Sequence, residues 1–213
     1  MRIISCDGNI GAGKSTLLLK IQKHHATNSN IVFINEPVNV WESVRDDNEN
    51  MIEKFYNNQC RYSFAFQMLV SMSILKEIKN AELINPNVTI IIERSVFSSR
   101  YIFAKMLNDN NIMSDVEMQI YTMWYDDNCL EYEPDFILYL NAEVDVCHDR
   151  IKQRNRKGEN DISIEYLKSC EKYNLSMLNM LTNDKVVIIN DKNKSKDDIF
   201  NEYISVFEKL NVY

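Results

Sequence analysis

Glycine and proline are scarce in this chain, which has four glycines and three prolines among its 213 residues. No stretch is rich in Pro, Gly or Ser, so neither a linker nor a low-complexity tail is expected. Three of the glycines, Gly8, Gly11 and Gly13, lie close together, and the fourth is Gly158. A sequence that otherwise avoids glycine uses it here, where the backbone must bend tightly or approach a ligand.

The chain also lacks paired cysteines and long apolar runs. Its five cysteines are odd in number, scattered and without a CxxC pair, which argues against zinc or a disulfide framework and favours a reducing compartment. No apolar run approaches the ~20 residues that span a bilayer. Because the first strand is expected to begin at Arg2, we expect no targeting segment before the fold, and a cytoplasmic protein that binds no membrane.

Positive charge is in deficit: the net charge is −7 and the pI is about 5.1. Binding to nucleic acid relies on neutralising phosphates, so an acidic chain is a poor candidate for that partner. Any phosphate-binding surface must therefore be local. With 45% hydrophobic residues, the length suits one domain over residues 1–213 with a sizeable core.

Five short apolar runs rich in β-branched residues predict strands buried on both faces of a parallel sheet. They cover residues 2–7, 31–36, 88–93, 135–140 and 185–190. Helical periodicity predicts helices between and after them, at residues 14–25, 63–81, 97–107, 115–130, 144–154, 164–181 and 197–210. Alternating strands and helices indicate an α/β fold with right-handed crossovers, and the connections are too long for the hairpins of an antiparallel sheet.

Residues 8–15 match the pattern GxxxxGK[ST] between a predicted strand and a predicted helix, which is the context of a P-loop. Backbone N–H groups of such a loop point at phosphate oxygens, and the helix adds the positive end of its dipole. Lys14 then contacts the β- and γ-phosphates of ATP, and Ser15 offers its hydroxyl to Mg²⁺. The predicted ATP-binding loop consists of Gly8, Asn9, Ile10, Gly11, Ala12, Gly13, Lys14, Ser15 and Thr16.

Two predicted strands end in a glutamate, the second at Glu36 and the third at Glu93, which Arg94 follows. Ligands of open α/β sheets bind outside the carboxyl ends of the strands. One carboxylate can accept the proton of a hydroxyl that attacks the γ-phosphate, and the other can help to hold Mg²⁺. Arg94 can spread positive charge over the transferred group. The alternative is a structural ion pair between Glu36 and Arg94.

Four segments resemble the deoxyribonucleoside kinase family, which includes deoxycytidine, deoxyguanosine and mitochondrial thymidine kinases. They are GNIGAGKST at 8–16, EPVNVW at 36–41, RYSFAFQ at 61–67 and ERSVFSSRYIFA at 93–104. The resemblance extends from Ile3 to about Leu181. It implies a P-loop kinase three-layer fold, with a five-stranded parallel sheet flanked by helices. It also implies phosphorylation of a deoxynucleoside 5′-hydroxyl by ATP and Mg²⁺.

Site roles follow from the same resemblance. Glu36 matches the general base, Arg94 the arginine beside it, and Gln67 the amide that reads the nucleobase through one acceptor and one donor. The aromatic walls of the base site match Trp41, Phe66 and Phe103 by position. The pair that holds the sugar 3′-hydroxyl matches Tyr56 and Glu159. Phe66 and Phe103 lie at helical spacing, so plain core positions are the alternative.

An arginine-rich lid is expected at about residues 150–162. Arg150 and Arg154 are four residues apart and so lie on one helix face, with Arg156 just beyond and Gly158 at the tip. Like charges on one face are mildly destabilising unless an anion lies between them. ATP phosphates would supply that anion, and a closing lid would exclude water. The alternative is a solvated basic helix face.

The chain departs from the deoxycytidine kinase pattern at two positions near the base. Ile74 stands where that subfamily has an arginine, and Ser99 where it has an aspartate. Uncharged residues there leave room for a methyl group on the base, so thymidine and deoxycytidine are both expected substrates. The loop at 190–195 lacks the aromatic residue expected at the ATP base, so other nucleoside triphosphates are alternative donors.

Two other functions compete with this interpretation. A deoxynucleoside monophosphate kinase of the thymidylate kinase type shares the P-loop, but Glu36 would repel the phosphate of its acceptor. A non-catalytic relative of the fold should lose the lysine or the acids, which this chain keeps. Family resemblance also implies a homodimer built on two long helices, residues 63–81 and 115–130.

Overall fold

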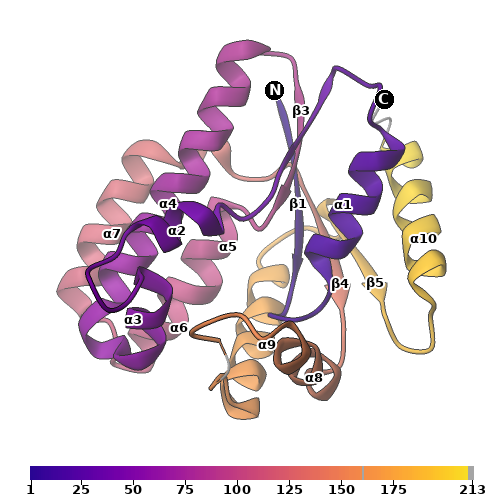
Figure 1. The fold of residues 1–213 in the computed structure, drawn as a ribbon. Helices are drawn as coiled ribbons and strands as arrows, with labels where there is room; N and C mark the ends of the chain where they lie inside the picture. Colours follow the sequence, from indigo (N-terminus) through magenta and orange to yellow (C-terminus); the bar gives the residue numbers. More distant parts are fainter. Residues whose placement is uncertain (160, 211–213) are drawn as a thin grey trace.

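A computed structural model describes residues 1–159 and 161–210 of the chain. Five parallel strands form one sheet in the order β2-β3-β1-β4-β5 (Figure 1). Their bounds are Arg2–Gly8 for β1, Ile31–Ile34 for β2, Thr89–Glu93 for β3, Phe136–Asn141 for β4 and Val186–Asn190 for β5. All five predicted strands are confirmed. The second, however, ends at Ile34, so Glu36 lies two residues beyond it in the loop rather than at its last position.

The helices confirm the alternating pattern and add two that periodicity did not predict. The predicted helices are observed as α1 (Lys14–His24), α4 (Gln59–Ile84), α7 (Asp115–Asn128), α8 (Val144–Arg154), α9 (Ile164–Leu178) and α10 (Lys196–Lys209). The two additional helices, α2 (Val38–Ser43) and α3 (Met51–Asn57), lie between β2 and α4. Both are too short to show a helical period, although Asn50 and Glu53 form a capping box at the start of α3.

The helix predicted at 97–107 is interrupted. It consists of α5 (Val96–Ser98), a π-helical stretch at Ser99–Ala104 and α6 (Lys105–Asp109). The wide turn is closed by a bond from the Lys105 N–H to the Arg100 carbonyl oxygen, five residues back. Such π-turns are rare in proteins overall, and those that occur are often found at functional sites.

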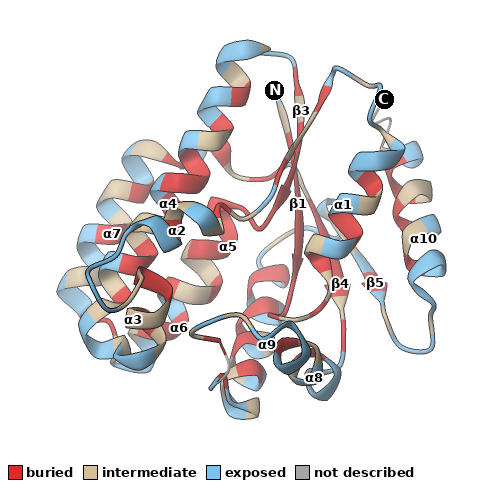
Figure 2. Ribbon diagram, in the orientation of Figure 1, coloured by how far each residue is buried: buried red, intermediate tan, exposed pale blue. Residues whose placement is uncertain are grey.

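Side chains of successive strand residues alternate between two cores, which makes the sheet the middle of three layers. Ile4 and Ile91 belong to a cluster with residues of α1, α9 and α10, whereas Ile3 and Ile90 belong to a cluster with residues of α4, α5 and α7. Figure 2 shows the central strands buried along most of their length, as expected for a parallel sheet with helices on both faces.

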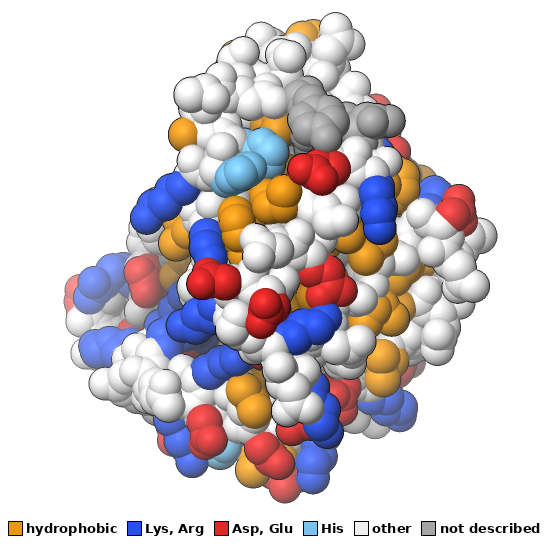
Figure 3. All heavy atoms as spheres, turned by 90° about the vertical axis from the view of Figure 1, so that its right-hand side faces the viewer, with side chains coloured by type: hydrophobic (Ala, Val, Ile, Leu, Met, Phe, Trp, Pro, Cys, Tyr) orange, Lys and Arg blue, Asp and Glu red, His pale blue; other side chains and the backbone are white. Residues whose placement is uncertain are grey.

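The outer surface carries both signs of charge. On the face of α1 and α10, acidic and basic side chains are interspersed with apolar ones (Figure 3), and Lys20 of α1 pairs with Asp197 of α10. All five cysteines are unpaired. Within residues 1–159 and 161–210, no helix is long and apolar enough to cross a bilayer.

Candidate active site

The loop between β1 and α1 wraps tightly because three of its residues are glycines with positive φ. These angles are 149° at Gly8, 79° at Gly11 and 103° at Gly13. A Cβ on Gly8 would lie 2.6 Å from the Leu140 carbonyl oxygen, and one on Gly11 would lie 2.3 Å from that of Cys147. Only glycine therefore lets the loop approach β4 and α8 this closely.

Lys14 opens α1 and is 5% exposed. Its Nζ donates to the carbonyl oxygens of Asn9, at 2.9 Å, and Gly8, at 3.3 Å. Burial lowers the pKa of Lys14 to about 8, and the positive charge of Arg94 acts in the same direction. An ammonium so poorly solvated is ready to bind an anion.

Asn9 turns its side chain away from the cavity and into the protein. Its Nδ2 donates to the Leu167 carbonyl oxygen of α9 at 2.9 Å, and its Oδ1 accepts from the Ile10 N–H at 2.8 Å. Asn9 was predicted to bind ATP. Asn9 does not line the cavity, and its side chain ties the loop to α9.

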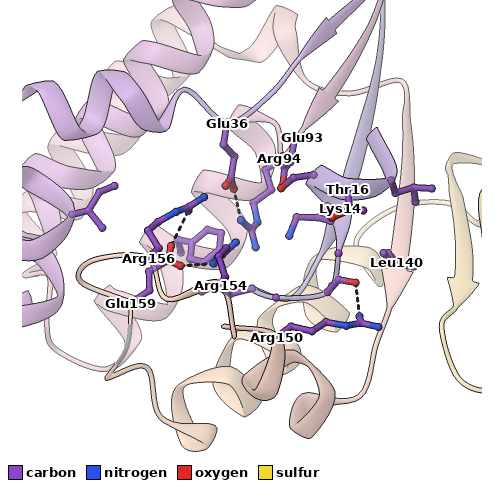
Figure 4. A pocket seen from close by; sticks show the side chains of 18 of the residues that line it. Lys14, Thr16, Glu36, Glu93, Arg94, Leu140, Arg150, Arg154, Arg156 and Glu159 are labelled. Atoms are coloured by element: carbon purple, nitrogen blue, oxygen red, sulfur yellow. Dashed lines mark hydrogen bonds and ion pairs between the residues drawn. The ribbon is translucent and has the colours of Figure 1, made fainter. Parts of the chain in front are cut away.

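Glu36, Glu93 and Arg94 meet at the carboxyl ends of β2 and β3 (Figure 4). Arg94 Nη1 donates to Glu36 Oε1, and its Nη2 donates to the Gly8 carbonyl oxygen at 3.2 Å. The backbone of Arg94 is left-handed, with φ of 56°, which costs about 1–3 kcal/mol for a bulky residue. Neighbouring contacts therefore hold this arginine in a strained conformation.

The two glutamates have opposite electrostatic environments. Burial by itself would raise the pKa of Glu36, but Arg94 and Lys14 outweigh it and lower that pKa below its ordinary value. Burial and the charge of Glu36 raise the pKa of Glu93. Ser15 Oγ donates to Glu93 Oε1 at 2.7 Å, so the two predicted metal ligands lie side by side.

A single cavity of about 700 Å³ connects the P-loop with the space beyond Glu36. Every predicted site residue except Gly8 and Asn9 lines it. Ile74 and Ser99, the two departures from the deoxycytidine kinase pattern, also line it and are buried. Residues from the P-loop, α2, α3, α4, the π-turn and the segment after α8 thus converge on one space.

Gln67 and three aromatic side chains occupy the far end of the cavity. Gln67 is 3% exposed, and its buried Oε1 has no hydrogen-bond partner. Trp41 packs edge-on against Phe66 with centroids 5.8 Å apart, and Trp41 Nε1 donates to Ser73 Oγ at 2.9 Å. The Arg94 guanidinium lies 5.1 Å from the Phe103 ring centre. A buried acceptor without a partner is costly unless a ligand satisfies it.

Tyr56 and Glu159 both line the cavity, but Glu159 is engaged by two arginines. Its carboxylate accepts from Arg154 and from Arg156, the latter at 2.9 Å. Burial raises the pKa of Tyr56, and the charge of Glu159 adds to this. The predicted pair is thus brought into one cavity, with Glu159 bonded to the arginines (Figure 4).

The third lid arginine binds elsewhere. Arg150 Nη1 donates to the Ala12 carbonyl oxygen at 2.9 Å and lies 2.7 Å from Asp191 Oδ2. The tip of the lid packs closely on the first turn of α3. A Cβ added to Gly158 would lie only 3.2 Å from the Glu53 backbone nitrogen. All three arginines line the cavity and are paired with carboxylates, Arg150 with Asp191, and Arg154 and Arg156 with the single carboxylate of Glu159.

Three residues that line the base end of the cavity were not predicted from the sequence: Ile52, Phe55 and Val70. Phe55 stacks on Phe66 with centroids 4.7 Å apart. Ile52 and Phe55 belong to α3, whose capping box was the signal in the sequence that could have located the helix. Val70 lies three residues after Gln67 on α4, so it shares that helix face.

The profile of the deoxynucleoside kinase family matches residues 4–210. The chain belongs to this family. It is similar to a probable deoxycytidine kinase of fowlpox virus, with 35% identity over 168 residues that cover 77% of this chain and 66% of the relative. Deoxycytidine kinase 1 of Xenopus laevis is 32% identical over 189 residues, covering 77% and 69%. This deoxynucleoside kinase is therefore a transferase that phosphorylates nucleosides.

A solved structure supports the fold of this kinase. Deoxyadenosine kinase from M. mycoides superposes with a TM-score of 0.79 at 23% identity, covering 99% of this chain and 100% of that one. That structure holds dCMP and a flexible dCDP as products. The likeness confirms the P-loop kinase fold predicted for the chain.

Proposed function

We propose that this deoxynucleoside kinase transfers the γ-phosphate of ATP to the 5′-hydroxyl of thymidine and of deoxycytidine. The observation that carries the proposal is the cavity itself. One end has the P-loop lysine, the middle has the Glu36–Arg94 pair, and the far end has an unpartnered Gln67 oxygen together with aromatic side chains. A phosphate-binding loop, a carboxylate that could accept a proton and an amide that could read a base thus line one space.

The P-loop, Lys14 and the lid arginines would hold the donor. Arg154 and Arg156 would leave Glu159, and Arg150 would leave Asp191, when phosphate oxygens compete for their N–H groups. Mg²⁺ fits beside them, since the Ser15 hydroxyl and the Glu93 carboxylate are adjacent oxygen ligands of the type it prefers. When bound, it would neutralise charge on the β- and γ-phosphates.

Glu36 would act as the general base. Its lowered pKa keeps it ionised near neutral pH, so it can accept the 5′-hydroxyl proton while that oxygen bonds to the γ-phosphorus and the bond to ADP breaks. Arg94 would hold Glu36 in place and stabilise charge on the transferred group. Tyr56 and Glu159 would bind the sugar 3′-hydroxyl, the latter once its arginines have turned to the donor.

Gln67 would read the base, with Trp41, Phe66 and Phe103 as the walls around it. Ile74 and Ser99 are buried in the cavity lining and add no charge there, so they would accommodate the C5 methyl group of thymine. The fowlpox and Xenopus relatives are described as deoxycytidine kinases, which supports deoxycytidine as the other substrate.

Both thymidine and deoxycytidine are expected to be phosphorylated, with kcat/KM values within about 200-fold of each other, since one methyl group in an apolar pocket contributes about 1–3 kcal/mol, a factor of about 10–200. Steady-state kinetics on all four deoxynucleosides, with ATP as donor, measures this. Absence of thymidine turnover would remove the proposed role of Ile74 and Ser99. Turnover of dTMP in preference to thymidine would instead support the monophosphate kinase alternative.

The chain is also expected to form a homodimer through α4 and α7. Val116, Ile120 and Met123 are 65%, 49% and 69% exposed and recur along one face of α7, and Met72 of the neighbouring α4 is 53% exposed. Met123→Glu should convert the dimer to monomers in sedimentation experiments. Leu175→Glu is the control, because Leu175 is a 46% exposed residue of α9. A wild-type chain that sediments as a monomer would contradict the proposal.

A further inference from the structure

Asp7 is a buried acid with no role in the binding or proton transfer proposed above. It lies near the end of β1, immediately before Gly8, and it is 0% exposed. Its side chain is not part of the cavity lining. Burying a carboxylate is costly unless the surroundings compensate, so its presence beside the P-loop calls for a physical reason.

Two hydroxyls on different elements hold this carboxylate. Ser5 Oγ, in the same strand, donates to Asp7 Oδ2 at 2.6 Å. Ser98 Oγ, in α5, donates to Asp7 Oδ1. Burial raises the pKa of Asp7, while these two hydrogen bonds and the charges of Arg94 and Lys14 act in the opposite direction. The Ser98 bond is the one that connects β1 to the segment following Arg94.

That segment must be held in place because Arg94 is strained. Its φ of 56° is left-handed, and a bulky residue keeps such a conformation only where its surroundings impose it. Two hydrogen bonds from Arg94 to β1 help to hold this conformation. The Arg94 N–H donates to the Cys6 carbonyl oxygen and Arg94 Nη2 donates to the Gly8 carbonyl oxygen, each at 3.2 Å. The third tie to β1 is the Ser98–Asp7 bond, four residues after Arg94.

We propose that Asp7 is a positioning residue for phosphoryl transfer. By holding Ser98, it fixes the end of α5, four residues after Arg94, and keeps Arg94 in its left-handed conformation, from which the guanidinium reaches Glu36. This inference rests on the proposed role of Glu36 as the base. Asp7 touches neither nucleoside nor ATP and acts through Arg94.

The two serines provide a matched test. Both are 0% exposed, and each donates one hydroxyl bond to Asp7, but only Ser98 reaches it from another element. Ser98→Ala should lower kcat by about 10- to 100-fold, the effect of a misplaced site group, with little change in the KM for thymidine. Ser5→Ala should leave kcat unchanged, because the bond it removes lies within β1.

The pH profile supplies a readout that general destabilisation would not produce. Glu36 faces Arg94, Lys14, Arg156 and Glu93, and the cations hold its pKa down against burial. If Arg94 drifts away, the pKa of Glu36 rises, and the acid limb of kcat/KM moves to higher pH in Ser98→Ala and Asp7→Asn. Direct loss of the Asp7 charge would shift that limb the other way, since removing an anion favours ionised Glu36.

An acid limb that stays in place or moves to lower pH in Asp7→Asn and Ser98→Ala would overturn the proposal, as would equal kcat values for Ser98→Ala and Ser5→Ala. If Asp7→Asn does not fold, the serine pair decides alone. Failure of the base role is recognised separately, because Glu36→Gln would then retain turnover. An inactive Glu36→Gln with indistinguishable serine variants would remove the role of Asp7 only.

Discussion

Replacing Glu36 by Gln is expected to lower kcat by about 10²–10⁴-fold, the usual contribution of a general base. The amide has nearly the shape of the carboxylate, and its oxygen can still accept from Arg94 Nη1, but it cannot take up the proton of the 5′-hydroxyl. Nucleoside binding should persist, because Gln67 and the aromatic walls are unchanged. Trp41 lines the cavity, so quenching of tryptophan fluorescence measures that binding alongside turnover.

A matched control is Glu42→Gln. Glu42 is an exposed acid of α2, six residues from Glu36 and outside the cavity lining. It should keep wild-type kcat. A Glu36→Gln enzyme with turnover within about tenfold of wild type would show that another group takes the proton, because such a small loss lies below the range of base catalysis.

Replacing Lys14 by Met should lower kcat/KM for ATP by about 10²–10³-fold, the effect of losing one preorganised donor to the transferred phosphoryl group. Met fills the space of the lysine stem without its charge. The folded state loses two hydrogen bonds to carbonyl oxygens but no longer buries an ammonium, so the two effects largely offset. The unfolding temperature without nucleotide should therefore change little.

The same variant tests the environment of Lys14 through pH. The pKa of Lys14 is about 8 in the folded protein and 10.5 ordinarily, so between these values the unfolded chain binds more protons. The free energy of unfolding that Lys14 contributes thus rises from pH 8 to pH 10.5. In Lys14→Met this part of the rise should vanish, as measured by urea unfolding. Lys23→Met, at an exposed position of α1, should retain it.

Local patterns predicted the fold well wherever neighbouring residues decide the structure. The P-loop could be recognised because its glycines, lysine and serine act within one short turn, and the five strands because each is a buried apolar run. The short helix α2 and the π-turn at Ser99–Ala104 could not be recognised, and only the capping box of Asn50 and Glu53 marked α3. Short helices show no period, and a wide turn depends on packing around it rather than on its residue types.

The sequence predicted which residues line the cavity better than it predicted which side chains bond to one another there. Glu36, Gln67 and Glu159 were expected at the substrate, and all three line the cavity. That Glu159 would hold Arg154 and Arg156, or that the Asn9 amide would bond to α9, did not follow from any motif. These side chains have several possible partners, and only the folded arrangement selects among them.

By itself, the sequence determined a P-loop, a parallel α/β fold and resemblance to deoxyribonucleoside kinases, because these depend on local backbone conformation and on the order of apolar runs. The tertiary structure decided the strand order β2-β3-β1-β4-β5, which sets β3 beside β1 although about eighty residues separate them. That adjacency lets Ser98 reach Asp7, and the pairing of β2 with β3 lets Arg94 reach Glu36. Such contacts join residues far apart in the chain, and their geometry exists only after the sheet has assembled.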